Sequence, residues 1–495
     1  MLGAIGLAIF LGLHRIGARA LWFDETYSFA VGKLEGAHLI KAVTRGDPSM
    51  GLYYLILHFW LHLGDSEATI RTLSVIFGVA SIPLIFFVGK ELFDEQVGMV
   101  AAVLLAVNSF FVEQSQEARG YSLALMLVTL STLLFIHAVR RGGKGRWVLY
   151  ALVSVLAVLA HAFSLFILIA HAGATLVFRA SRARRLRLML IAAGVLLAGA
   201  LAAAPVLKLA IGDERWTWIH LPARSTIAQE LGGLFGQQGW LLVGYLFLIC
   251  IGAALFVQCL VNKEEGDKDW SYALALAMFF VPVVGSILGS FIIPMFVLRY
   301  LTIALPGLIL SVAVGVTRSG ARWVSIGVFV TVLALSAVSL NRFYEDPPAY
   351  KDGPWRNAST FFLSKVHDGD TVLFDSLATA VLFNYYYRSL PDVPPRLEFP
   401  FLPPVLNDGS SLLAPGLGAK AALEEKPLPR RVWVLLGGVP GAKGRFPPEG
   451  MGQRYRPGPV AAAFQSARMQ LFLKEKPPKD HHRKSSPAQA EAKSS

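Results

Sequence analysis

The chain has 495 residues, of which 54% are hydrophobic and only 16% are charged, and its mean hydropathy is +0.53. A soluble globular protein does not need so many apolar runs of bilayer length, so the composition indicates a polytopic membrane protein. The formal net charge of +13 does not indicate nucleic-acid binding, because Lys and Arg cluster in short gaps between apolar runs, where they fix topology. Cys250 and Cys259 lie in one apolar run, too far apart along a helix for a disulfide.

Eleven apolar segments have the length and composition of membrane-spanning helices. No basic residue precedes the first segment, so we interpret "ARA" at 18–20 as following an uncleaved helix and not as a signal-peptidase site. With eleven spans, the basic gaps at 140–146, 179–187 and 318–322 fall on one side, which is predicted to be cytoplasmic. The predicted spans are 1–18, 72–93, 97–113, 121–139, 147–163, 164–179, 187–209, 239–261, 271–293, 300–317 and 323–341.

The segment "MGLYYLILHFWLHLG" (50–64) is a further apolar run, and counting it as a span would give a twelve-helix protein. It is short and carries two histidines among aromatic residues, as interfacial helices often do. We therefore predict a helix along the outer membrane surface within a long first outer loop, 19–71, and a second outer loop at 210–238.

Beyond residue 341 the composition shifts to Pro, Gly and charged residues, which predicts a small extracytoplasmic α/β domain at 342–473. The last segment, 474–495, has almost no apolar residues and is predicted to be disordered, its "DHHRK" being tail and not a metal site. The predicted elements of the domain are helices at 354–366 and 376–390 and strands at 370–375 and 431–438.

Charged residues that lie at or near membrane depth are costly unless they are paired or functional. Five outward segments carry such residues next to apolar runs, and these segments hold our candidate site residues. They are "FDE" (23–25), "RGDPSMGLYY" (45–54), "QEARGY" (116–121), "HAF" (161–163) and "LRY" (298–300).

Residues 15–345 resemble, in order and spacing, the bacterial membrane glycosyltransferases of the GT-C superfamily. The resemblance is strongest to the branch with the protein O-mannosyltransferases and the lipid A aminoarabinose transferases, and it rests on "LWFDETYS", "GLYYLILHFW" and "SQEARGY". It implies a GT-C transmembrane module at 1–341, in which 210–238 is a mobile outer loop. It also implies transfer of a sugar from a polyprenyl-phosphate carrier to a lipid, glycan or protein acceptor. The reaction would take place at the extracytoplasmic face of a bacterial inner membrane.

The residues fit such a reaction chemically. A phosphate is already a competent leaving group and needs positive charge, whereas the acceptor hydroxyl needs one base, so transfer would invert the anomeric carbon. Asp24 matches the family's catalytic aspartate, and the alternative is that it caps a surface helix. Its neighbour Glu25 points elsewhere if the chain is extended, and would anchor a basic partner or the acceptor, or join catalysis.

The next candidates are assigned to substrate binding. Asp47 matches a carboxylate that helps bind a divalent metal in aminoarabinose transferases, but "SMGLYY" replaces the usual "PPLYY", and a turn aspartate is the alternative. Glu117 and Arg119 form an ion pair, or Arg119 meets the donor phosphate or Glu25 while Glu117 orients sugar or acceptor. Tyr121 donates to the phosphate or belongs to the aromatic belt.

Two more segments complete the candidate site. His161 lies at an outward turn and is either packed there or active. Arg299, followed by Tyr300, begins the tenth span and is suited to phosphate recognition, the alternative being an interfacial anchor that reaches for water. In the loop 210–238, the aromatic and basic residues of "DERWTWIH" would stack on sugar or lipid, or rest at the interface.

Two other functions fit part of the pattern. An O-antigen ligase or polymerase would use a diphosphate-linked glycan, but the acidic "FDE" of the first outer loop disfavours it. A transporter or flippase would show paired broken helices in related halves and charges near the bilayer midplane. The acids here gather on one outer face and no halves repeat, so the sequence favours an enzyme that works with membrane lipids and does not bind nucleic acid.

Overall fold

The computed structural model falls into two compact units, each described here by itself. The first comprises residues 1–356 together with 381–386, and the second is built around a small sheet. The residues that the structure describes are 1–212, 219, 221–236, 239–262, 267–346, 355–374, 377–388, 430–437, 455–464 and 467–474. The predicted disordered tail lies outside them apart from its first residue, Lys474, which ends a strand.

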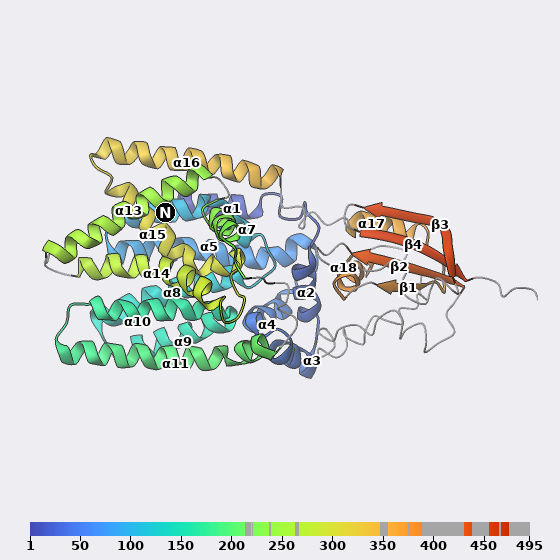
Figure 1. Ribbon diagram of the computed structural model, residues 1–495, viewed down its shortest axis with the longest axis horizontal. Coiled ribbons are helices and arrows are strands. Elements are labelled where there is room, and N and C mark those ends of the chain that lie inside the picture. The colour runs from blue at the N-terminus through green and yellow to red at the C-terminus, as the bar shows by residue number, and fades with distance from the viewer. Residues whose placement is uncertain are drawn as a thin grey trace, which may run out of the picture. The chain divides into compact units, whose positions relative to one another are not determined.

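Each of the eleven segments predicted to span the membrane is helical, and the helices run side by side as a bundle (Figure 1). The helices are α1 (Leu2–Leu13), α5 (Glu67–Leu92), α6 (Glu95–Val107) with α7 (Ser109–Ser115), α8 (Tyr121–Arg141), α9 (Lys144–Ala160), α10 (Leu165–Val177), α11 (Arg182–Gly212), α13 (Gly239–Asn262), α14 (Lys268–Gly289), α15 (Leu305–Thr317) and α16 (Arg322–Glu345).

Seven helices of the described chain are long and apolar enough to cross a bilayer, and the pair α6 and α7, bent by 64°, makes an eighth if it is one span. The bend lies at Asn108, whose side chain accepts from the Phe111 N–H and so caps α7. The helices α1, α9 and α10 are shorter, with 12, 17 and 13 residues. The chain is thus a mainly helical, multi-pass membrane protein.

Three short helices lie together at one end of this bundle (Figure 1). They are α2 (Phe23–Gly32), α3 (Gly36–Lys41) and α4 (Gly51–Trp60), all within the first predicted outer loop. Helix α4 has ten residues, about 15 Å of helix, which is half the thickness of the hydrocarbon layer. The segment 50–64 is therefore too short to be a twelfth span.

The second unit contains a four-stranded sheet with the strand order β1-β2-β4-β3. Strands β1 and β2 are parallel, and the other pairs are antiparallel. Leu373, Val432, Val434, Tyr455 and Phe472 form its apolar core. The elements are α17 (Trp355–Leu363), β1 (Thr371–Phe374), α18 (Leu377–Arg388, whose middle part belongs to the helical unit), β2 (Arg431–Gly437), β3 (Tyr455–Phe464) and β4 (Ala467–Lys474).

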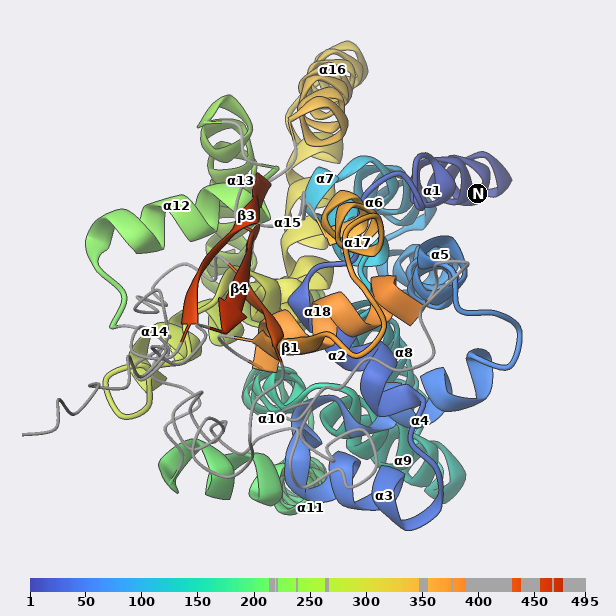
Figure 2. The same ribbon diagram turned by 90° about the vertical axis from the view of Figure 1, so that its right-hand side faces the viewer.

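Helix α15 forms the centre of the bundle, and it packs closely because of two glycines. In the view of Figure 2 it lies between α13, α14 and α6. The most apolar 18 residues of the span Leu298–Thr317, which α15 completes, are 94% buried, against 28% for those of the outer helix α16. A Cβ at Gly307 would lie 2.4 Å from the Phe279 nitrogen of α14, and a Cβ at Gly315 would lie 2.3 Å from the Leu248 oxygen of α13. Since both neighbours are backbone atoms, a larger residue would force the helices apart.

We expect Gly307→Ala to destabilise the protein by about 1–3 kcal/mol through overpacking against α14. Gly327→Ala is the matched control, because nothing lies within 4 Å of the site of its Cβ. Thermal unfolding of the two purified variants in detergent checks this. Equal melting temperatures would contradict the close approach of α14 and α15.

Candidate active site

The two acidic residues of "FDE" lie in the first turn of α2, which begins at Phe23. The chain here is helical and not extended, so adjacent side chains diverge by about 100° around the axis. Trp22 occupies the N-cap position, and the Glu25 carboxylate accepts a 3.3 Å bond from its backbone N–H. The alternative in which Asp24 caps the helix is therefore wrong, and its carboxylate is left to make other contacts.

Glu25 is held by Arg71 of α5 in a buried ion pair. The two guanidinium–carboxylate distances are 2.6 and 2.7 Å, and the side chains are 1% and 7% exposed. The Ala118 N–H also donates to this carboxylate at 3.0 Å. Arg71 directs its other N–H groups to the backbone carbonyls of Ile16, Arg19 and Ala20. Glu25 thus anchors a basic partner, as one of our interpretations had it, and the partner is Arg71 and not Arg119.

Asp24 faces a different pair of cations. Its Oδ2 lies 3.6 Å from Nη2 of Arg299 and 4.0 Å from Nε of Arg119, and its side chain is 17% exposed. The Arg299 guanidinium also lies over the rings of Trp22 and Tyr300, at 5.4 and 5.8 Å from their centroids. One partly accessible carboxylate therefore sits between two guanidinium groups.

Asp47 joins the same cluster through Tyr54. The Tyr54 hydroxyl donates to Asp47 at 2.5 Å and accepts from Nη1 of Arg119 at 2.8 Å, and Nη2 of Arg119 lies 3.9 Å from Asp47. Burial would lower the pKa of Arg119, but Tyr54 and the carboxylates of Asp24 and Asp47 raise this pKa well above its usual value. Burial also raises the pKa of Tyr54, so its hydroxyl remains a proton donor.

An aromatic wall adjoins the two guanidinium groups. The ring of His161 lies 5.5 Å from that of Tyr121 and 5.1 Å from that of Tyr300, and Phe163 completes the group at 5.0 Å from Tyr300. The Tyr121 hydroxyl is buried and has no hydrogen-bond partner among the described residues. A buried polar atom of this kind is costly unless a ligand completes it.

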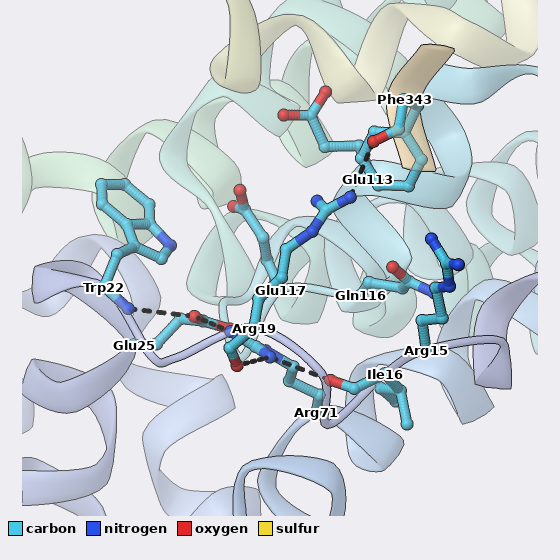
Figure 3. A pocket seen from close by; sticks show the side chains of 10 residues that line it. All are labelled: Arg15, Ile16, Arg19, Trp22, Glu25, Arg71, Glu113, Gln116, Glu117 and Phe343. Carbon is cyan, nitrogen blue, oxygen red and sulfur yellow. Dashed lines mark hydrogen bonds and ion pairs between the residues drawn. The ribbon is translucent and has the colours of Figure 1, made fainter. Parts of the chain in front are cut away.

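Glu117 lines a polar pocket together with Trp22 and Glu25 (Figure 3), and its charge also acts on Arg299 of the cluster. Trp22 contributes to both places, because it lines the pocket and lies against Arg299. Neither Asp24 nor Arg119 lines the pocket. The pocket is lined by Arg15, Ile16, Arg19, Trp22, Glu25, Arg71, Glu113, Gln116, Glu117 and Phe343.

The residues around Asp47 do not fit a divalent metal. No group of three or more His, Cys, Asp or Glu side chains is gathered anywhere in the described part of the chain. Asp47 and Asp24 both lie within 4.0 Å of Arg119, whose positive charge would oppose a cation beside them. No step of the chemistry is therefore assigned to a metal.

The structure thus brings together most of the candidates from distant segments, which are Asp24, Asp47, Arg119, Tyr121, His161, Arg299 and Tyr300. Glu25 is turned toward Arg71, and Glu117 lines the adjoining pocket and acts on Arg299. Sequence reasoning missed Trp22, Tyr54 and Arg71. Arg71 had a signal, because an arginine in the first turns of an apolar helix requires a partner. The predicted aromatic residues of "DERWTWIH" (213–220) lie outside the described residues apart from Ile219.

Comparison with known proteins shows which of them have a similar fold. Residues 47–208 match the family described as dolichyl-phosphate-mannose-protein mannosyltransferase. The crystal structure of ArnT from Cupriavidus metallidurans bound to undecaprenyl phosphate aligns over 95% of this chain and 97% of its own, with a TM-score of 0.58 and 10% identity. The chain therefore has the fold of these GT-C glycosyltransferases, and its residues 47–208 are similar to the mannosyltransferase family.

Two further proteins that this chain resembles are larger than it is. Archaeal oligosaccharyltransferase AglB from Archaeoglobus fulgidus, solved with an inhibitory peptide and a dolichol-phosphate, aligns with a TM-score of 0.51 and 11% identity over 80% of this chain and 64% of AglB. The dolichyl-diphosphooligosaccharide–protein glycosyltransferase subunit STT3B of Arabidopsis thaliana is 28% identical over 125 residues, which are 24% of this chain and 16% of the plant protein. The chain thus spans under two thirds of each.

Removing one partner of the buried Glu25–Arg71 pair leaves an uncompensated charge, so we expect Arg71→Ala to cost about 3–5 kcal/mol of stability. Arg45→Ala is the control, because Arg45 is an exposed arginine of the same outer loop. Thermal unfolding of both variants in detergent measures the difference. If Arg71→Ala and Arg45→Ala unfold at the same temperature, Arg71 does not hold the loop together.

Proposed function

We propose that this protein is a glycosyltransferase that moves a sugar from a polyprenyl-phosphate carrier to an acceptor hydroxyl, with inversion at the anomeric carbon. The observation that carries the proposal is the position of Asp24 between the guanidinium groups of Arg119 and Arg299. The GT-C fold supports it, since ArnT was solved with undecaprenyl phosphate and AglB with a dolichol-phosphate.

Arg119 and Arg299 are assigned to the donor phosphate. Their planar groups present several N–H donors, and positive charge here stabilises the phosphate as it leaves. The buried Tyr121 hydroxyl, beside the same arginines, is a third donor for a phosphate oxygen. His161 and Tyr300 form the wall of this place, and Asp47 orients Arg119 through Tyr54.

Asp24 is assigned as the general base. Its carboxylate takes the proton of the acceptor hydroxyl while the hydroxyl oxygen bonds to the anomeric carbon. The bond from that carbon to the phosphate oxygen breaks, and the electron pair leaves with the polyprenyl phosphate. A single displacement on the face opposite the phosphate inverts the anomer. Glu25 supports this reaction as an anchor, and Glu117, next to Trp22, is assigned to the sugar or acceptor side.

We place the site on the extracytoplasmic side of a bacterial inner membrane. The other end of the bundle is basic, with Arg140 and Arg141 in the last turn of α8 and five arginines between 179 and 187. Short basic loops favour the cytoplasm. A carrier with a polyprenyl chain brings its sugar along the membrane to the opposite end, and a lipid, glycan or protein there is the acceptor.

We expect Asp24→Asn to lower sugar transfer by about 10²–10⁴-fold, because an amide cannot take the acceptor proton. Asp65→Asn, at a carboxylate of the same loop that is 65% exposed, is the control and should transfer normally. The measurement is release of undecaprenyl phosphate from a panel of undecaprenyl-phosphate sugars by protein in nanodiscs. Full activity of Asp24→Asn would remove this residue from the mechanism.

The orientation has a separate test with single cysteines introduced after Cys250 and Cys259 are replaced by alanine. We expect Asp65→Cys to react with a membrane-impermeant maleimide in intact bacterial cells, since its loop faces outward. Lys144→Cys, in the basic gap at 140–146, should react only after the cells are permeabilised. The reverse labelling pattern would place the site on the cytoplasmic side and so contradict the proposed reaction.

A further inference from the structure

A carboxylate of the second outer loop is bonded to the turn that carries Arg299. Glu230 lies in α12 (Arg224–Leu234), and its carboxylate accepts a 2.9 Å hydrogen bond from the backbone N–H of Leu298. Leu298 begins the short 3-10 helix Leu298–Ala304, whose next two residues are Arg299 and Tyr300. The first N–H groups of a helix lack intrahelical partners, and no side chain at the N-cap position serves this one. Glu230 fills that role from another element.

The same face of α12 is shaped to lie against Leu298. Gly233 follows Glu230 by three residues, and a Cβ there would lie 2.3 Å from a methyl carbon of Leu298. The Leu298 side chain therefore occupies the space that a side chain at 233 would need. Burial in this contact raises the pKa of Glu230, although the Leu298 N–H and the charge of Arg299 counteract the rise.

The C-terminal end of α12 is anchored to the bundle. The Phe235 ring lies 5.8 Å from that of Tyr245 and 6.0 Å from that of Phe279, and the Asn108 side chain donates to the Leu234 carbonyl at 3.5 Å. The side chains of Ser225, Thr226, Ala228 and Gln229, earlier in the helix, are exposed. Glu230 thus connects the anchored C-terminal part of α12 to the turn that carries Arg299.

We propose that Glu230 is a positioning residue for the donor phosphate, which acts by holding Leu298 and so placing Arg299 beside Asp24. The inference rests on the proposed function, because it assigns Arg299 to the phosphate. The geometry uses Glu230 as a hydrogen-bond acceptor, and a glutamine side chain carries an acceptor oxygen of the same reach. A glutamine at position 230 should therefore preserve the hydrogen bond to Leu298, and an alanine should not.

The test measures binding of undecaprenyl phosphate to the full-length protein in nanodiscs by native mass spectrometry. We expect Glu230→Ala to weaken binding about fivefold to tenfold, the usual effect of losing a helix cap. Glu230→Gln and the control Gln229→Ala, an exposed neighbour in α12, should stay within about twofold of the parent. In a transfer assay, Glu230→Ala should raise the donor KM by the same factor and also lower kcat, because a displaced Arg299 stabilises the leaving phosphate less.

Unchanged binding by Glu230→Ala would overturn the inference, and so would a loss as large in Glu230→Gln. If Glu230→Ala does not fold, Gly233→Leu decides, because it displaces Leu298 while Gly232→Leu meets nothing within 4 Å of its Cβ. Equal binding by these two variants would also overturn it. If the parent binds undecaprenyl phosphate but transfers no sugar, the proposed function is wrong. The difference in binding between the parent and Glu230→Ala would still test the role of Glu230.

Discussion

The buried ion pair between Arg71 and Glu25 is the interaction on which the arrangement of the site depends. Every N–H of the Arg71 guanidinium has an acceptor, two on Glu25 and three on backbone carbonyls of the loop after α1. Glu25 in turn accepts from the backbone of Trp22 and Ala118. One side chain of α5 therefore joins the loop after α1, the start of α2 and the turn before α8. A buried charge pair persists only when its remaining hydrogen bonds are satisfied, as they are here.

The ion pair between Arg71 and Glu25 also sets the direction of Asp24. Because α2 is helical and Glu25 is fixed toward Arg71, its neighbour is turned by about 100° to another side of the helix, where Arg119 and Arg299 lie. The same helix α5 supports Arg119 as well, since Ser74 donates to its backbone carbonyl at 3.3 Å and meets the Tyr53 hydroxyl at 3.0 Å. The two adjacent acids thus divide into one that builds the site and one that faces it.

The parts of this structure that follow from local pattern were predictable. The apolar runs predicted the helices of the bundle, and the short length of 50–64 correctly set it apart from the spans. On the assumption of an extended chain, the sequence predicted that the Glu25 and Asp24 side chains point apart. They do point apart, but the reason is the helical turn of α2. Strands β3 and β4 were missed, because Pro457, Gly458 and Pro459 read as loop, and such residues are tolerated in β3 only because it is an edge strand.

The meeting of distant residues could not be read from periodicity. Arg119 and Arg299 lie 180 positions apart, and only the resemblance to a family assigned both to one site. Arg71 was overlooked because its segment was divided between the end of a loop and the start of a span, whereas α5 begins at Glu67 and makes it part of the helix. Tyr54 was quoted only within a motif, and its link between Asp47 and Arg119 is a matter of tertiary geometry.

The position of Asp24 has a consequence for the order of events in the proposed reaction. Two guanidinium groups that are only 9% and 21% exposed need a counter-charge, and Asp24 contributes to it before a donor binds. A carboxylate in this role is directed toward the cations and not toward an acceptor hydroxyl. A donor phosphate would take over as their counter-ion and release Asp24 to accept a proton. Asp24 would then be free to turn toward an acceptor hydroxyl only when the leaving group is in place.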